Sequence, residues 1–353
     1  MKGILREVRK VMQEKSEDSQ EAEKWVTKSR LITKIEQLPG DASTRKYFRI
    51  FSNEKTLILM KMEAFHGQKD KVPFLEVAEH LAKSGVRVPE VLEQDAAAGY
   101  ILLEDLGDTT LLHKLRFVAD TDVEKKLYYR VIDELVKIHY FASPPRAKGP
   151  IRAFELKFDF EKLFWEVGFA IEHFYERHLD RKIISADRKI MDEQFSKICV
   201  ELANEPTVFC QRDFHCRNIM ALERGAGKDE LVMIDFQDAR MGPAQYDLAS
   251  LLKDSYYQLE ERQVENCIEY YISEWQKVSG QRLDAAMFRR IFDLMAVQRN
   301  FKAIGTFASI YTKRRNSTYL KYVGNTFENI RRTLLKYPEF APLREALFYY
   351  YYF

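Results

Sequence analysis

The stretch QRDFHCRN at residues 211–218, followed after an apolar run by DFQD at 235–238, decides the fold. It places acid or amide side chains at Asp213, Asn218 and Asp235. An Asp can orient an attacking hydroxyl and accept its proton, an Asn five residues later can turn back to a metal ion, and an Asp at a strand end can hold a metal on phosphates. The spacing predicts a phosphoryl-transfer centre with Asp213 as catalytic base and Asn218 and Asp235 as magnesium ligands.

Each part of this pattern also has a plain structural explanation. Taken alone, Asp213 and Asn218 would be turn or capping residues, and Asp235 would be a strand-end acid. With the apolar run LVMI at 231–234 between them, however, the residues follow the order H-x-D-x-x-x-x-N, strand, D-F-G that protein kinases carry. The joint spacing therefore favours a kinase that uses ATP and Mg²⁺.

Short strand-like runs fill the first third of the chain, and helical patterns fill the rest. A helix that ends near Gly85 interrupts the early strands, and few strands are expected beyond Gly107. This segregation predicts an α+β fold, in which a small antiparallel-sheet lobe precedes a large helical lobe. Early strands are expected at 31–38, 46–51, 56–62, 88–92 and 100–103, and later ones at 207–210 and 231–234. Later helices are expected at 122–142, 159–178, 183–203, 245–257, 260–276, 284–311 and 318–336.

Three segments follow from this pattern. Residues 1–30 are predicted to contain an N-terminal surface helix, residues 31–106 a nucleotide-binding N-lobe, and residues 107–353 a helical C-lobe with the catalytic loop and the acceptor site.

The small lobe of a kinase needs a lysine for the phosphates and a glutamate that holds it. Lys61 ends the apolar strand at 56–62, and Glu76 follows fifteen residues later on the predicted helix. Glu79 competes with Glu76, because the two can lie near one helix face. A surface lysine at a strand end is the alternative explanation for Lys61.

Two loops of the small lobe are candidate nucleotide contacts. Gly40, Asp41 and Ser43 lie in the GDAST loop where a phosphate-covering turn belongs, although the loop has no G-x-G-x-x-G pattern and an ordinary hairpin turn is equally compatible. Glu104 and Leu106 leave the sheet where the backbone could pair with an adenine.

Composition excludes several classes of protein. The chain has 353 residues, 56 Lys plus Arg against 54 Asp plus Glu, and 46% hydrophobic residues, which fits a globular protein with a nearly balanced charge. The four cysteines form no C-x-x-C pair, so neither a disulfide framework nor a zinc site is expected. No apolar segment is long enough for a membrane span, and no basic and aromatic module indicates nucleic acid. A cytoplasmic protein with no membrane or nucleic-acid partner is predicted.

The motifs together resemble the aminoglycoside phosphotransferase-like kinases, and most of all their bacterial branch of N-acetylmuramate and N-acetylglucosamine kinases. The segments that carry the resemblance span nearly the whole chain, from GDAS at 40–43 through EDLGD at 104–108 and the motifs at 211–239 to GPAQYDLA at 242–249, QRNFK at 298–302 and GTF at 305–307. The resemblance implies a bilobal protein-kinase-like fold, ATP and Mg²⁺ as cofactors, and phosphorylation of the anomeric hydroxyl of a small sugar. It also implies that Asp247 is a structural acid that anchors the catalytic loop.

The sequence departs from the family at the start of the catalytic loop. Gln211 stands where the family usually has an orienting His, and a Gln can replace it because it both donates and accepts hydrogen bonds. Gln211 and the missing glycine pattern also leave open a catalytically weak pseudokinase or binding module. Within the loop, His215 and Arg217 are candidate substrate contacts, although local packing explains His215 equally well.

Charge in the last third of the chain bears on the acceptor. Between Asp284 and Arg332 the sequence has three acids and ten bases, which disfavours a polycationic aminoglycoside and favours a neutral or anionic substrate. Arg299 and Lys302, three residues apart, can share one helix face and bind a carboxylate. An aminoglycoside or another small-molecule acceptor remains the alternative, as does a solvated basic face.

Overall fold

The computed structural model describes most of the chain, in two compact units. The first unit spans Met1–Val72 and Pro89–Gly107, and the second spans Pro73–Val88 and Asp108–Phe353. The predicted phosphate loop with Gly40, Asp41 and Ser43 lies outside the described residues. The residues that the structure describes are 17–27, 32–39, 45–53, 55–65, 72–223 and 229–353.

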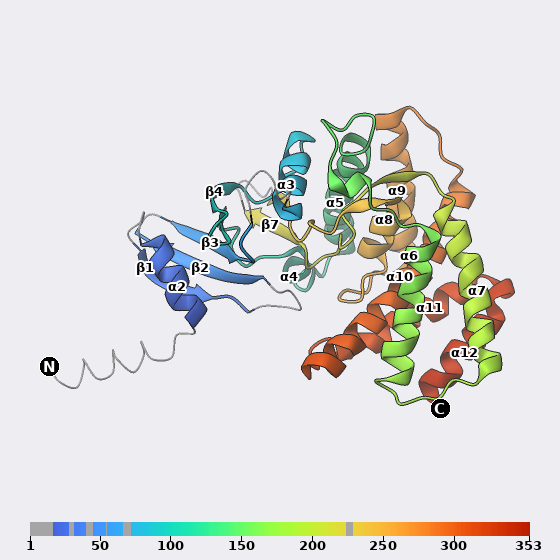
Figure 1. Cartoon of the computed structure of the whole chain (residues 1–353). Helices are drawn as coiled ribbons and strands as arrows, with labels where there is room; N and C mark the ends of the chain where they lie inside the picture. Colours follow the sequence, from blue (N-terminus) through green and yellow to red (C-terminus); the bar gives the residue numbers. More distant parts are fainter. Residues whose placement is uncertain (1–16, 28–31, 40–44, 54, 66–71, 224–228) are drawn as a thin grey trace. The chain divides into compact units, whose positions relative to one another are not determined.

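The first unit is a five-stranded antiparallel sheet, and this confirms the strand-rich early third of the chain (Figure 1). The strand order is β1-β2-β3-β5-β4, and in the register Leu59 faces Phe48 on one side and Leu102 on the other. The strands are β1 (Ile32–Gln37), β2 (Lys46–Ser52), β3 (Thr56–Lys61), β4 (Val91–Asp95) and β5 (Tyr100–Glu104).

One face of this sheet is covered by helix α2 (Glu17–Val26), the described part of the predicted N-terminal helix. Ala22 and Val26 of α2 pack with a cluster of sheet residues that includes Phe48, Leu57 and Leu59. Because side chains alternate along a strand, the residues of β3 that share this face are every second one. Burying these apolar side chains stabilises the small unit, at about 25 cal/mol for each Å² removed from water.

The second unit is mainly helical, as the sequence predicts, and its two-stranded sheets carry the loops of interest. Strand β6 pairs with β9, and β7 pairs with β8, both antiparallel. The strands are β6 (Thr207–Cys210), β7 (Ile219–Glu223), β8 (Asp229–Met233) and β9 (Arg240–Pro243). The α-helices are α3 (Pro73–Lys83), α4 (Leu111–Leu115), α5 (Thr121–Phe141), α6 (Phe160–Ala170), α7 (Ser185–Ala203), α8 (Gln245–Leu252), α9 (Glu261–Ser279), α10 (Ala285–Arg314), α11 (Val323–Leu335) and α12 (Ala341–Tyr352), and a π-helix at Ile171–Glu176 continues α6.

Helix α10 runs through the centre of this unit and packs on α6 at very close range. A Cβ atom placed on Gly305 of α10 would lie 2.4 Å from the Cα of Ala170, a distance that no side chain tolerates. Glycine is therefore needed at this crossing, and the close contact fixes how α10 presents its other face.

The segment Pro73–Val88 belongs to the second unit, whereas the sequence assigned it to the N-lobe segment 31–106. Its contacts explain the difference. The ring nitrogen Nε2 of His80 lies 2.7 Å from the carbonyl oxygen of Ala142, and the Phe74 ring stacks on Phe236 with centroids 5.2 Å apart.

Several elements differ from the sequence prediction. Strands β7 and β9 were not expected, and β9 contains Gly242 and Pro243, whose residue types indicate a turn. The aromatic C-terminal end, which lies beyond the last predicted helix, forms helix α12, which buries Leu343 and Leu347. Among the described residues, no helix is both long enough and apolar enough to cross a membrane.

Candidate active site

The loop that follows β6, residues 211–218, is held at its start by Asp247 of α8. Oδ2 of Asp247 accepts a hydrogen bond from the Gln211 backbone N–H at 2.7 Å, and Oδ1 accepts one from the Arg212 N–H at 2.9 Å. Arg212 has φ of 83°, a left-handed conformation that a non-glycine residue keeps only where its surroundings impose it. Asp247 therefore fixes a strained turn, which agrees with the anchoring role that the resemblance implies.

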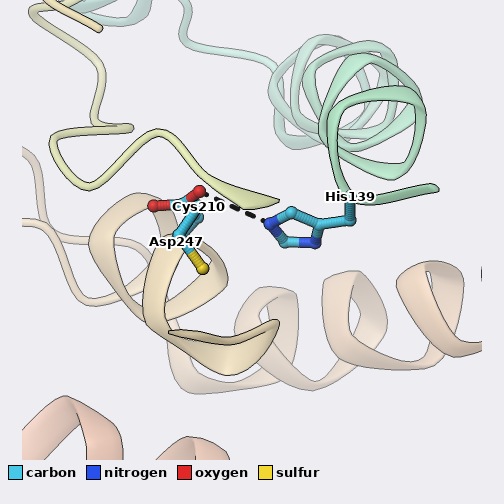
Figure 2. Close-up of side chains that lie close together, drawn as sticks. All are labelled: His139, Cys210 and Asp247. Carbon is cyan, nitrogen blue, oxygen red and sulfur yellow. Dashed lines mark hydrogen bonds and ion pairs between the residues drawn. The ribbon is translucent and has the colours of Figure 1, made fainter. Parts of the chain in front are cut away.

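Figure 2 shows the side chains of His139, Cys210 and Asp247, which are buried and lie close together. Their potential ligand atoms lie within 4.8 Å of one another, but each has another partner. His139 Nε2 is 3.4 Å from Asp247 Oδ2 and its Nδ1 is 2.8 Å from the hydroxyl of Tyr271, while the Cys210 thiol donates to the carbonyl of Pro243. Burial also raises the pKa of the Cys210 thiol well above its usual value. The group supports the loop, and its ligand atoms are engaged in these hydrogen bonds.

Gln211 itself joins the two motifs. Its side-chain Nε2 donates to the carbonyl of Ile234 at 3.0 Å, directly before Asp235. This bond ties the start of the 211–218 loop to the end of the strand segment that carries the second acid, which is the orienting role expected for this position.

Asn218 and Asp235, the predicted metal ligands, lie side by side. The Asn218 Nδ2 donates to the carbonyl of Asp213 at 3.0 Å and lies 3.3 Å from Asp235 Oδ2. Because the amide nitrogen is used for donation, the Asn218 Oδ1 stays available as an acceptor, next to an exposed carboxylate. Both side chains offer hard oxygen ligands of the kind that Mg²⁺ prefers, and a shared metal would require Oδ1 of Asn218, rather than the Nδ2 that faces Asp235 here, to turn toward the ion.

Asp213 is partly buried, and its carboxyl group is surrounded by positive charge. Burial raises the pKa of Asp213, but the charges of Lys302 and Arg212 outweigh this effect and bring the pKa to about 2. The side chain is therefore ionised at neutral pH, so it can accept a hydrogen bond from a hydroxyl and orient it.

A pocket lies directly in front of Asp213, and we call it the α10 pocket. Helix α10 supplies one wall of it, and the segment after α8 supplies another. The lining residues are Asp213, His215, Asp254, Ser255, Tyr256, Arg299, Lys302, Ala303, Thr306 and Phe307. The structure thus brings the predicted base together with three of the four predicted substrate contacts.

The fourth, Arg217, lies beside this pocket. Its guanidinium sits 4.8 Å from the ring centroid of Tyr256 and 5.5 Å from that of Tyr319. His215 packs edge-on against Tyr256, with centroids 5.1 Å apart, and burial lowers its pKa, which favours the neutral ring.

Lys61 is engaged inside the first unit. It follows Leu57 and Leu59 on the face that α2 covers, and its ammonium lies 2.6 Å from Glu21 Oε2 and 2.9 Å from Asp18 Oδ1. Hydrogen bonding to Glu21 raises the pKa of Lys61. The predicted contact with nucleotide phosphates requires that Lys61 leave these two carboxylates.

Its predicted partner belongs to the second unit. Glu76 accepts a hydrogen bond from the Arg152 backbone N–H at 3.1 Å, and the competing Glu79 forms an ion pair with Lys83. The pairing of Lys61 with a glutamate of α3 stays a prediction.

Backbone at the end of β5 is held in place by an ion pair. The Arg49 Nε lies 2.8 Å from Asp105 Oδ2, and the same guanidinium donates to the Gly107 carbonyl. Glu104 accepts from the Glu90 N–H at 3.2 Å. The segment from Glu104 to Leu106, proposed to meet an adenine, thus has a fixed course.

Sequence reasoning missed two residues around the loop. Asp254, fully buried, accepts hydrogen bonds from the backbone N–H groups of Cys216 and Tyr256, at 3.1 and 2.8 Å. Buried Glu166 of α6 lies 4.0 Å from the Arg212 guanidinium and accepts from the Gln298 amide at 3.2 Å. Neither stands in a recognisable motif, so only spatial proximity shows them.

The fold and this site define a phosphotransferase with a protein-kinase-like architecture. A model of the phosphotransferase enzyme family matches residues 34–280, and the chain belongs to that family. It is similar to the N-acetylmuramate/N-acetylglucosamine kinase of Neisseria meningitidis, at 30% identity over 313 residues that cover 87% of this chain and 88% of the relative. The Pseudomonas aeruginosa protein of the same name is 32% identical over 87% of this chain and 86% of its own length.

Solved structures support the fold. Choline kinase LicA from Streptococcus pneumoniae superposes with a TM-score of 0.60 at 14% identity, over 90% of this chain and all of that one. The ADP-bound aminoglycoside phosphotransferase APH(2'')-Ib gives 0.57 at 14% identity, over 88% of this chain and 97% of that one.

Proposed function

We propose that the protein transfers the γ-phosphate of ATP, with Mg²⁺, to the anomeric hydroxyl of a small amino sugar, N-acetylmuramate or N-acetylglucosamine. The observation that carries the proposal is the ionised Asp213 at the α10 pocket, with Asn218 and Asp235 beside it on the same anchored loops. The names of the two bacterial relatives supply the substrate class. Because ATP is supplied there, we expect the reaction in the cytoplasm.

The chain's own residues contribute mainly by positioning. Asp213 accepts a hydrogen bond from the attacking hydroxyl, aims its oxygen, and takes up its proton as the new bond forms. Alignment of this kind can supply a large part of the rate, because little covalent chemistry is asked of the protein. Asn218 and Asp235 hold the metal, and a bound Mg²⁺ neutralises charge on the phosphate oxygens.

The nucleotide is proposed to meet two parts of the first unit. The adenine pairs with backbone groups between Glu104 and Leu106, whose course Arg49 fixes. Lys61, once released from Asp18 and Glu21, is a candidate for the phosphates, as is the loop with Gly40, Asp41 and Ser43. The ADP named with the aminoglycoside phosphotransferase neighbour supports a nucleotide in this fold.

Two other functions are weaker on specific grounds. A pocket for an aminoglycoside, which carries several ammonium groups, should be acidic, whereas in this one Arg299 and Lys302 offset the charges of Asp213 and Asp254. A pseudokinase has no need to keep Asn218 in contact with both Asp213 and Asp235. Gln211, the main support for that alternative, makes the hydrogen bond to Ile234 that an orienting residue should make.

A coupled assay of ADP release tests the proposal. Purified protein with ATP and Mg²⁺ should turn over N-acetylmuramate and N-acetylglucosamine, and should neglect kanamycin. The Asp213→Asn variant should lose about 10²- to 10⁴-fold in rate. Turnover of kanamycin above both sugars, or no turnover of any of the three, would overturn the proposed function.

A further inference from the structure

We propose that Arg299 and Lys302 form a carboxylate-binding subsite of the α10 pocket, so that the preferred acceptor is an acidic sugar such as N-acetylmuramate and not neutral N-acetylglucosamine. This inference rests on the proposed function and adds a choice between the two sugars. The ligand group is the ether-linked lactyl carboxylate, which N-acetylglucosamine lacks.

The first argument is placement. Arg299 and Lys302 lie one helical turn apart on α10, and Ala303, Thr306 and Phe307 continue the same face into the pocket. Two contacts hold this face in register: the close packing of Gly305 on Ala170, and the Gln298 amide, which donates to the Leu163 carbonyl at 3.1 Å. The two cations are thus presented on a rigid helix.

The second argument is that, among the described residues, no carboxylate forms an ion pair with either cation, although the charge of Lys302 lowers the pKa of Asp213. Arg299 is only 7% exposed, yet among the described residues it forms no ion pair, and its buried Nε has no hydrogen-bond partner. Within the same part of the chain Lys302 forms no ion pair either, and burial lowers its pKa. A buried charge without a partner is costly, so an anionic ligand would gain from meeting this pair.

The third argument concerns the acids near the pair. Each carboxylate oxygen of Asp254 accepts a hydrogen bond from one backbone N–H group, Oδ2 from Cys216 and Oδ1 from Tyr256. Asp213 is reserved for the reacting hydroxyl. Arg217, over the Tyr256 ring, adds a further positive charge beside the pocket. The two cations therefore offset the charges of Asp213 and Asp254 in the lining, and their own donors stay open to a ligand, for which the planar guanidinium of Arg299 suits a carboxylate.

A different role for Arg299 and Lys302, contact with the transferred phosphoryl group, can be distinguished by experiment. Arg299 and Lys302 could instead contact the phosphoryl group as it moves, in which case they would serve every acceptor equally. A carboxylate subsite serves only acceptors that carry a carboxylate, so the two roles differ in their dependence on the sugar.

The test compares three acceptors at saturating ATP and Mg²⁺: N-acetylmuramate, its methyl ester, and N-acetylglucosamine. With the unmodified protein, kcat/KM for N-acetylmuramate should exceed that for the ester and for N-acetylglucosamine by about 10- to 100-fold, mostly through KM, because one charge-assisted contact has that value. This comparison needs no variant. Equal values for N-acetylmuramate and its ester would overturn the subsite.

Variants then assign the subsite to the pair. Arg299→Gln and Lys302→Gln should each remove most of the preference for N-acetylmuramate, measured as the ratio of its kcat/KM to that of N-acetylglucosamine. Arg299→Lys keeps the charge and should keep part of the preference. Arg314→Gln, at the exposed end of the same helix, is the matched control and should change neither sugar. An equal loss for both sugars would assign the pair to the phosphoryl group, whereas absence of turnover with either sugar in the unmodified protein would instead reject the proposed function.

Discussion

The side chains of Asn218 and Asp235 meet at 3.3 Å although seventeen positions separate them in the chain. The β7–β8 hairpin makes this possible, because Asn218 directly precedes β7 and Asp235 follows β8 by two positions. Strand pairing therefore brings the amide and the carboxylate to the same end of one hairpin. The paired strands β7 and β8 thus bring together the motifs at 211–218 and 235–238.

Replacing Asp235 with Asn should weaken nucleotide binding only when magnesium is present. A dication on phosphate oxygens prefers an anionic oxygen ligand over an amide oxygen. Calorimetric titration of ATP with and without Mg²⁺ measures the difference. Asp238→Asn, on an exposed neighbour, is the control, and an unchanged magnesium dependence in Asp235→Asn would reject the metal assignment.

Asp247→Ala should destabilise the second unit as well as abolish activity. The change leaves the buried N–H group of Gln211 and the partly buried one of Arg212 without acceptors, at a cost of about 1–4 kcal/mol in the free energy of unfolding. Urea unfolding measures this cost. Asp180→Asn, at an exposed position with φ of 53° that Asn tolerates, should have little effect. Equal stability of Asp247→Ala and the unmodified protein would remove the anchoring role.

Gln211→His should remain active, whereas Gln211→Ala should be slower. The His can restore a hydrogen bond to the Ile234 carbonyl, but the Ala leaves that bond unmade. Steady-state rates of the unmodified protein, Gln211→His and Gln211→Ala test this order of activities. If only Gln211→His has activity, the unmodified chain is a pseudokinase.

Activity with a neutral sugar should not fall on the acid side until well below pH 5. The pKa of Asp213 is about 2, below the usual carboxyl value of about 4, because Lys302 and Arg212 outweigh the effect of burial. The ionised form therefore stabilises the fold above about pH 4, and this contribution is lost as the pH falls through 2. A profile of kcat/KM for N-acetylglucosamine tests it, and loss of activity beginning near pH 6 would contradict the assignment of Asp213.

Removing the acids of α2 should increase the affinity for ATP if Lys61 serves the phosphates. In Asp18→Asn/Glu21→Gln the Lys61 ammonium no longer has to leave two carboxylates, so KM for ATP should fall. Lys24→Gln removes a charge from an exposed position of the same helix and serves as control. A rise in KM for the double variant, or no effect of Lys61→Met, would instead assign Lys61 to the packing of α2.

The sequence was sufficient for the separation of an early strand-rich part from a later helical part, and for the proximity of the proposed site residues. Asp213, Asn218 and Asp235 could be predicted because their spacing is set by a loop and a hairpin of fixed length, and Arg299 with Lys302 because helical periodicity places them on one face. Asp254 and Glu166 could not be predicted, since their partners are distant in the chain. Strand β9 was missed because its pairing with β6 overrides the turn tendency of Gly242 and Pro243.

Lys61 shows another limit of sequence reasoning. A lysine at the end of an apolar strand has the same local pattern on either face of the sheet, and only the packing of α2 on Leu57 and Leu59 shows which face it shares. Its pairing with Asp18 and Glu21 depends on a helix that lies forty residues earlier in the chain.

Phosphorylation of the anomeric hydroxyl with Asp213 as base is tested most directly by identifying the reaction product. Phosphorus NMR of a reaction with N-acetylmuramate, ATP and Mg²⁺ should show ADP together with a sugar phosphate coupled to the anomeric proton, and Asp213→Asn should give almost none. A phosphate on any other hydroxyl, or the same product at a similar rate from Asp213→Asn, would contradict the account.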